Sequence, residues 1–157
     1  MNIQRLTEQE CYSMLTSSGC GRLACARDNQ PYVVPIYFVV GDRCVYSFAL
    51  PGQKVHWMRD NPKVCLEVDS IGARNDWTSV VVNGRYHELS DTPKFERERA
   101  LAQRLLQQRA MWWEPGAVSL DGHVGGYVPI VYRISLDSMS GLRGVPVTPD
   151  ISASVSG

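Results

Sequence analysis

Apolar and polar positions alternate in several short runs of this chain, which is the pattern of half-buried β-strands. We predict six strands, at residues 22–27, 31–40, 43–50, 63–68, 77–89 and 130–136. The turn sequences Asp28-Asn29-Gln30 and Gly41-Asp42 join the first three of them into a meander of hairpins. Gly84 lies inside the fifth strand and predicts a bulge or the close approach of another segment.

Three segments carry helix signals instead of strand signals. Thr7 and Glu10 have the spacing of a capping box, so a short helix is expected to begin there. A second helix is expected between Pro51-Gly52, which break the third strand, and Pro62. Thr92-Pro93 provide an N-cap and a first helical position for the longest helix.

The order of these elements indicates the fold class. Most of the strands are joined by short turns, and the helices do not alternate with them as in a parallel sheet. We therefore predict a mainly β protein with α additions, built as an antiparallel barrel. Residues 1–141 are expected to form one domain, and residues 142–157 lack periodicity and are expected to form a mobile tail.

Composition narrows the possible partners and location. The 157 residues include 16 basic and 16 acidic side chains, and this balance argues against a nucleic acid or an anionic membrane as partner. No apolar run approaches the roughly 20 residues that cross a bilayer. The polar N-terminus, MNIQRLTEQE, has no signal-peptide pattern, so a cytoplasmic protein is expected.

The cysteines and the known catalytic motifs give no sign of a metal site or of common hydrolase or nucleotide-binding chemistry. The five cysteines are odd in number and lack metal-ligand spacing, which favours reduced thiols over disulfides or zinc. Neither a GxSxG elbow, a GxxxxGK[ST] loop nor a GxGxxG fingerprint occurs. No catalytic residue can be assigned from the sequence.

The stretch SFALPGQKVHWMRDNP, residues 47–62, places a basic residue where a strand becomes a helix. A helix N-terminus has unpaired N–H groups and a partial positive charge, which attract phosphate. Gly52 permits close approach of the backbone, and Lys54 adds a full positive charge in the first turn although it opposes the helix dipole. An anionic ligand would explain this choice, and an ordinary surface lysine is the alternative.

The preceding strand has a proline at an unusual position. Pro35 removes a ladder donor from an otherwise strong strand, so this stretch is expected at an edge, a bulge or a surface that faces a ligand. Tyr37, Tyr46, Ser47 and Phe48 add aromatic rings and hydroxyls, which suit a flat heteroaromatic ring with polar edges. A proline at the barrel rim above an aromatic core is the alternative.

Four segments in this order, PYVVPIYFVV, VYSFALPGQK, VHWMRDNPKVCLEV and DWTSVVVNGRYHEL, resemble the FMN-binding split-barrel family. Its members are similar in fold to pyridoxamine 5′-phosphate oxidase, and the closer likeness is to the 5-nitroimidazole-resistance, nitroreductase-like branch. The resemblance covers about residues 10–141. It implies a split β-barrel homodimer that holds FMN at the subunit interface.

The resemblance also implies which residues bind the cofactor. Lys54 matches the lysine that contacts the flavin phosphate, and Gln53 is next to it. The other matching positions form three strand segments: Pro35, Ile36 and Tyr37 along the isoalloxazine ring; Tyr46, Ser47 and Phe48 beside the phosphate and ribityl chain; and Trp77, Thr78 and Ser79, which reach the flavin from the partner subunit.

Two departures from the family pattern limit the analogy. Val34 stands where the oxidase has a second phosphate ligand, an arginine, so Arg22 or the Arg74-Asn75 loop is a candidate replacement. Gln53 stands where nitroimidazole reductases have a histidine. The substrate-binding C-terminal segment of the oxidase is not recognisable, which argues against oxidation of pyridoxamine phosphate.

The function that the resemblance implies is that of an FMN-dependent oxidoreductase. A nicotinamide cofactor would reduce the flavin, which would then reduce a small electrophile such as a nitroaromatic or a quinone. The alternatives are a module that binds flavin, deazaflavin or haem without turnover, as a sensor or carrier. Trp112 and Trp113 are candidates for a wall of the cleft, and His123 is the isolated candidate for a haem ligand.

Overall fold

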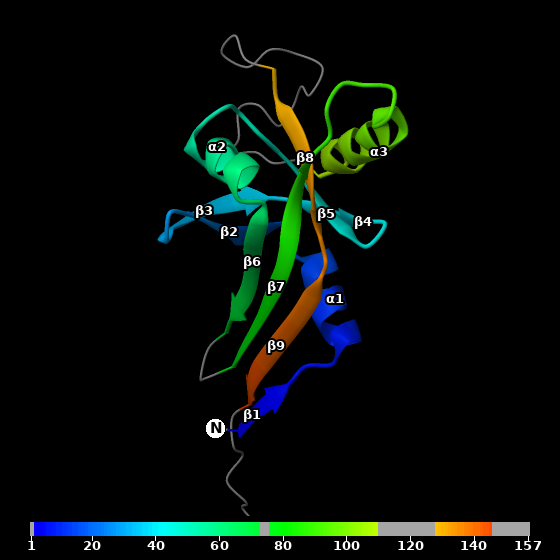
Figure 1. Ribbon diagram of the computed structural model, residues 1–157. Helices are drawn as coiled ribbons and strands as arrows, with labels where there is room; N and C mark the ends of the chain where they lie inside the picture. Colours follow the sequence, from blue (N-terminus) through cyan, green and yellow to red (C-terminus); the bar gives the residue numbers. More distant parts are fainter. Residues whose placement is uncertain (1, 73–75, 110–127, 146–157) are drawn as a thin grey trace, which may run out of the picture.

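The computed structural model describes residues 2–72, 76–109 and 128–145 of the chain (Figure 1). These residues form a mainly antiparallel β structure with three helices. The elements in chain order are β1 (Asn2–Arg5), α1 (Glu8–Ser17), β2 (Cys20–Arg27), β3 (Gln30–Tyr37), β4 (Val39–Gly41), β5 (Cys44–Ala49), α2 (Gln53–Asp60), β6 (Lys63–Ile71), β7 (Trp77–Glu88), α3 (Glu96–Gln107), β8 (Ile130–Ser135) and β9 (Ser138–Val145).

Strand β7 connects the two parts of the sheet. Its first residues pair with β6 on one side and with β9 on the other, and its last three residues pair with β8. The main path of hydrogen-bonded neighbours runs β3-β2-β6-β7-β8-β5-β4, and β9 also pairs with β1. Every pairing is antiparallel, and the arrangement is consistent with a split barrel.

Two apolar clusters form the core. The larger one lies between the sheet and helices α1 and α2, and contains the fully buried Leu15, Leu66 and Met58. The smaller one lies beneath α3 and contains Tyr46 and Leu106. Figure 1 shows α1 on one face of the long strands β6, β7 and β9. Helices α2 and α3 lie at the end of the molecule that is far from β1.

Several local predictions are confirmed. The side chain of Thr7 accepts from the Glu10 backbone, and Glu10 accepts from the Thr7 backbone, which completes the capping box of α1. Gly84 is a point of close approach, because a Cβ there would lie far inside the van der Waals contact distance to the Ser135 carbonyl oxygen. Asp28 and Asn29 have positive φ angles, as expected for the turn between β2 and β3.

The predicted strand 31–40 is divided in the structure. Strand β3 ends at Tyr37, and the short strand β4 pairs only with β5. Between them, the Phe38 N–H donates to the Gly19 carbonyl at 3.2 Å and its side chain is fully buried. The chain therefore passes at Phe38 from one part of the sheet to the other.

The expected start of the longest helix was wrong. Helix α3 begins at Glu96 with Phe95 in the N-cap position, and residues 92–95 form turns. Thr92 donates its N–H to the Ser90 carbonyl at 2.8 Å, and its hydroxyl lies 3.3 Å from the Ser90 hydroxyl. The side chain that was expected to cap the helix is thus used within the preceding turn.

The boundary of the expected C-terminal tail needs correction. Residues 142–145 belong to strand β9, which pairs with β1 on one side and with β7 on the other. Strands β1 and β9 escaped the sequence pattern because β1 is exposed throughout and the only buried residues of β9 are its two glycines. Strand β9 is stabilised by hydrogen-bonded pairing on both of its edges and not by burial of an apolar face. The tail residues 146–157 lie outside the described part.

Gly84 gives a test of how the two parts of the sheet fit together. Gly84→Ala places a methyl group against the backbone oxygen of Ser135, which no side-chain movement can relieve. We expect this overpacking to lower the free energy of unfolding by about 1–3 kcal/mol. Urea denaturation measures the change, with the exposed Ser140→Ala as control at roughly ±0.5 kcal/mol. Equal stability of both variants would contradict the close approach.

Candidate functional site

Helix α2 begins at a glycine that leaves its N-terminus open. Gly52 occupies the N-cap position, makes no side-chain cap, and has extended backbone angles (φ 175°, ψ −174°). A Cβ at Gly52 would meet only the Leu50 carbonyl oxygen, at 4.0 Å. The first turn has no acidic residue and contains Gln53, which is exposed, and Lys54, which is half-buried. This combination is suited to an anion.

The side of α2 that faces the sheet is apolar. Val55 and Met58 are three residues apart and both are buried, which explains why this short stretch folds as a helix. The Trp57 ring lies 5.6 Å from the Tyr32 ring on β3. The helix is therefore packed against β2 and β3, and its N-terminus stands at the end of β5.

The positive charge of Lys54 acts on the neighbouring Cys25 of β2. Burial raises the pKa of the Cys25 thiol, and the charge of Lys54 lowers it by a smaller amount. The net pKa lies above the ordinary value of 9.0, so this thiol stays protonated at neutral pH. Cys25 is thus a packing residue beside Lys54, and its chemistry is not that of an activated nucleophile.

The C-terminal end of α2 is held by ionic and hydrogen-bonded contacts. Arg59 donates two hydrogen bonds to Glu88, the last residue of β7, at 2.8 and 2.7 Å. These bonds hold the pKa of Glu88 below its ordinary value. Asp60 forms an ion pair with Arg27 at 3.2 Å, and Asn61 donates to the Ala26 carbonyl at 2.9 Å. Arg59 and Glu88 are 29 residues apart, and no local sequence signal connects them.

Strands β3 and β5 bring together two of the predicted segments. The buried Ser47 hydroxyl donates to the Tyr37 carbonyl oxygen at 2.5 Å. Ile36 is buried as well, Phe48 is half-buried, and Pro35 is exposed. The Ser47–Tyr37 bond thus joins the two predicted strand segments, Pro35, Ile36 and Tyr37 on β3 and Tyr46, Ser47 and Phe48 on β5, and β5 leads directly into the turn before Gln53 and Lys54.

Tyr46 belongs to the smaller apolar cluster of the core. It is fully buried beneath α3, and its hydroxyl donates to Glu98 Oε1 at 3.2 Å. Glu98 also accepts from Arg133 at 2.6 Å. Burial, followed by the charge of Glu98, raises the pKa of Tyr46. The side chains of Tyr46 and Ser47 are thus engaged within the protein, and they fix the strand that lies beside α2.

The third predicted segment lies at the other end of β7. Trp77 pairs with Ile71 at the end of the β6–β7 hairpin, and its indole packs over Gly144 of β9. The Ser79 hydroxyl donates to Glu67 at 3.3 Å. Pro35 and Val81 of β7 are connected by the register Pro35–Arg22–Glu67–Val81, three inter-strand steps or ~15 Å. Within one chain the two groups of predicted residues are therefore separate.

One face of the sheet is shared by Pro35, Trp77 and Ser79. Paired residues in an antiparallel ladder point to the same side, and the registers place these three on the face opposite α1. This open face also carries four exposed apolar side chains: Ile3, Val33, Ile71 and Leu142. Ile71 is 78% exposed. A sheet face with this composition is unusual for a surface that remains in water.

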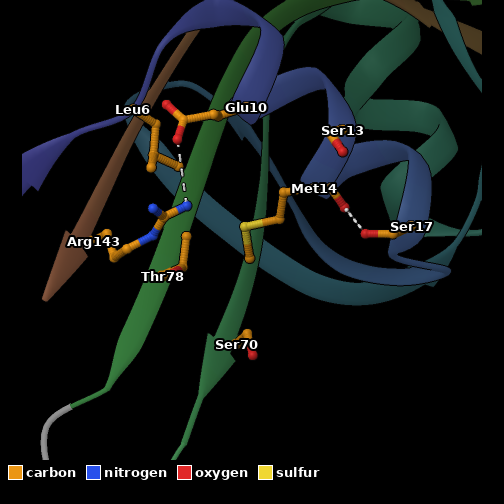
Figure 2. A pocket seen from close by; sticks show the side chains of 8 residues that line it. All are labelled: Leu6, Glu10, Ser13, Met14, Ser17, Ser70, Thr78 and Arg143. Atoms are coloured by element: carbon orange, nitrogen blue, oxygen red, sulfur yellow. Dashed lines mark hydrogen bonds and ion pairs between the residues drawn. The ribbon is translucent and has the colours of Figure 1, made fainter. Parts of the chain in front are cut away.

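Thr78 points the other way, towards α1. It lines an open cavity of about 300 Å³ between α1 and strands β6, β7 and β9 (Figure 2). Ser70 and Arg143 pair with Thr78 in the ladders, and Arg143 lies 3.6 Å from Glu10 of α1. The complete lining is Leu6, Glu10, Ser13, Met14, Ser17, Ser70, Thr78 and Arg143. Thr78 is the one predicted cofactor residue in it.

Arg22, a candidate for the second phosphate ligand, is engaged with two carboxylates in this structure. Its guanidinium forms ion pairs with Glu67 at 3.2 Å and with Asp69 at 2.5 Å, on the open face of the sheet. These two carboxylates compete with any anion for the same positive charge. The other candidates that the sequence suggested, Arg74-Asn75, Trp112-Trp113 and His123, lie outside the described residues.

All five cysteines are free thiols, and two of them are buried. Cys11 and Cys25 are buried, whereas Cys20 is exposed. In the described parts of the chain, no group of three or more histidine, cysteine or acidic residues is arranged to hold a metal ion. Among the same residues, none of the helices is long and apolar enough to cross a membrane.

Comparisons with known proteins identify relatives of the whole domain. A family model described as pyridoxamine 5′-phosphate oxidase matches residues 7–143. An uncharacterized protein from Rhizobium meliloti is 38% identical over 143 residues, which are 90% of this chain and 95% of that protein.

Solved structures with the same fold include flavoproteins. A FAD-binding protein from Mesorhizobium loti has 40% identity and a TM-score of 0.78, with 92% of this chain and all of that chain covered. A candidate 5-nitroimidazole antibiotic resistance protein from Bacteroides thetaiotaomicron has 17% identity and a TM-score of 0.63, with 92% and 90% covered. The second likeness is one of fold alone.

Proposed function

Because this chain belongs to the pyridoxamine 5′-phosphate oxidase family, we propose that it is a flavin-dependent oxidoreductase. In this proposal a nicotinamide cofactor donates electrons, and the acceptor is a small electrophile such as a nitroaromatic or a quinone. The observation that supports the proposal is the open N-terminus of α2, which follows the predicted segment of β5 in the chain and has Gln53 and Lys54 in its first turn.

The residues around α2 fit a phosphorylated flavin. The absence of a side-chain cap at Gly52 and the space above it leave the first turn accessible to a phosphate, which Lys54 and Gln53 would hold. Pro35, Ile36 and Tyr37 would lie along the ring, and Phe48 and the main chain of β5 along the ribityl chain. When bound, the flavin supplies the hydride or electron transfer, and this chain supplies binding and orientation. No side chain is assigned as acid or base.

The form of the flavin has two candidates. FMN is the form that the family resemblance implies. FAD is favoured by the likeness to the FAD-binding protein from Mesorhizobium loti at 40% identity.

A homodimer is part of the proposal. The two groups of predicted cofactor residues are separate in one chain, and Pro35, Trp77 and Ser79 share the open face that carries exposed Ile3, Val33, Ile71 and Leu142. A second copy packed on this face would cover its apolar side chains. It would also bring Trp77 and Ser79 of one subunit towards the α2 site of the other.

The first test is an absorbance spectrum of the purified protein, followed by chromatography of the small molecule released on denaturation. We expect flavin bands, release of FMN or FAD, and reoxidation of the reduced flavin by a nitroaromatic or a quinone. Tight flavin retention without turnover would favour a sensor or carrier. A Soret band would favour haem, with His123 as the candidate ligand. Release of a deazaflavin would identify that compound as the cofactor in place of FMN or FAD. Failure to bind any of these would overturn the proposal.

Lys54→Ala tests the phosphate site. Loss of a charge-assisted contact costs about 1.5–3 kcal/mol, so we expect the Kd for FMN to rise roughly 10- to 100-fold. The Kd for riboflavin, which has no phosphate, should change less than about twofold. Fluorescence titration with both flavins measures the effect, and Lys94→Ala on the exposed segment before α3 is the control. Equal losses for both flavins would make Lys54 a structural residue.

Ile71→Arg tests the proposed subunit interface. A charge placed on a desolvated apolar contact should weaken association at least about tenfold and lower flavin occupancy with it. Light scattering across a dilution series measures the association. Ala100→Arg, on the exposed side of α3, is the control and should leave both properties unchanged. A wild-type monomer with full flavin occupancy would rule out a shared site.

A further inference from the structure

The two ends of α2 differ in how they are held. At the C-terminal end, Arg59 Nε donates to Glu88 Oε2 at 2.8 Å and Arg59 Nη2 donates to Glu88 Oε1 at 2.7 Å. A bidentate guanidinium–carboxylate pair fixes both the distance and the relative orientation of its partners. Because Arg59 lies in the last turn of α2 and Glu88 ends β7, this pair fixes the helix to the central strand.

Glu88 is itself fixed from the side of the sheet. The hydroxyl of the buried Tyr86 donates to Glu88 Oε2 at 3.0 Å. The Tyr86 ring lies 5.1 Å from the ring of Tyr132 on β8, and Tyr132 is the ladder partner of both Glu88 and Ser47. Through these contacts the carboxylate connects the end of α2 to β5, the strand that precedes the proposed phosphate site.

We propose that Glu88 and Arg59 are positioning residues that set the first turn of α2 against β5 and thereby determine how tightly a flavin phosphate is held. This inference rests on the proposed function. The eight residues of α2 span ~12 Å, so a tilt of about 5° at the clamped end moves the first turn by about 1 Å. Hydrogen bonds to phosphate tolerate only a few tenths of an ångström.

The remaining contacts of α2 keep the helix folded without this clamp. Val55 and Met58 stay buried against the sheet, and Asn61 still donates to the Ala26 carbonyl. The ion pair between Arg27 and Asp60 is a single contact between more exposed side chains. Removal of the clamp should therefore change the position of the first turn more than the stability of the fold.

Glu88→Gln tests the inference, because it removes the charge and keeps the size of the side chain. We expect the Kd for FMN to rise about five- to tenfold, with the Kd for riboflavin unchanged within about twofold. In a Lys54→Ala background the same substitution should cause no further loss for FMN, since the phosphate contact is already missing. Fluorescence titration gives both constants, and the melting temperature without flavin reports the fold.

The matched control is Arg43→Gln, which removes the Arg43–Glu8 ion pair on the β4–β5 turn and does not touch α2. It should leave the ratio of the two dissociation constants unchanged, and Arg59→Lys should give an intermediate ratio because it keeps the charge but loses the fork. An unchanged ratio in Glu88→Gln, or equal losses for both flavins, would overturn the inference. A wild-type protein that binds neither flavin would overturn the proposed function and this inference with it.

Discussion

The architecture depends on the sharing of β7 between two parts of one sheet. Its first residues are enclosed by β6 and β9, and its last three pair with β8. At Gly84, where the pairing changes, only a residue without a Cβ fits against the Ser135 carbonyl. Because Glu88 ends the same strand and clamps α2, the position of the proposed phosphate site is set by how β7 crosses the core.

The site combines rigid parts with few side chains directed at a ligand. Tyr46 and Ser47 are both buried. The Tyr46 hydroxyl donates a hydrogen bond to Glu98, and the Ser47 hydroxyl donates one to the Tyr37 carbonyl. In the proposed function these residues hold the strand, and the start of α2 would recognise the anion. On this proposal a short motif around Gly52 can be sufficient to bind a phosphate, because the buried strand that precedes it keeps the start of α2 in place.

Most predictions that rest on a local signal are confirmed, with the N-cap at Thr92 as an exception, and features that depend on distant partners were missed. The capping box at Thr7, helix α2 and the close approach at Gly84 follow from short-range chemistry. Strands β1 and β9 owe their stability to pairing with distant partners, so their own patterns are too weak to reveal them. Likewise, the pairs Arg59–Glu88 and Arg22–Asp69 join positions far apart in the chain, so only the folded structure reveals them. The first pair holds α2 against β7, and the second engages Arg22, a candidate phosphate ligand, with a carboxylate.

Neighbouring positions along β7 serve two different surfaces. Trp77, Ser79 and Val81 belong to the open face, whereas Thr78, Val80 and Val82 face α1 and the core. A shift of the strand by a single residue would exchange the two sets. The effect of substitutions in this segment should therefore alternate with a period of two: one set changes the open face, and the other disturbs the interior of the same subunit.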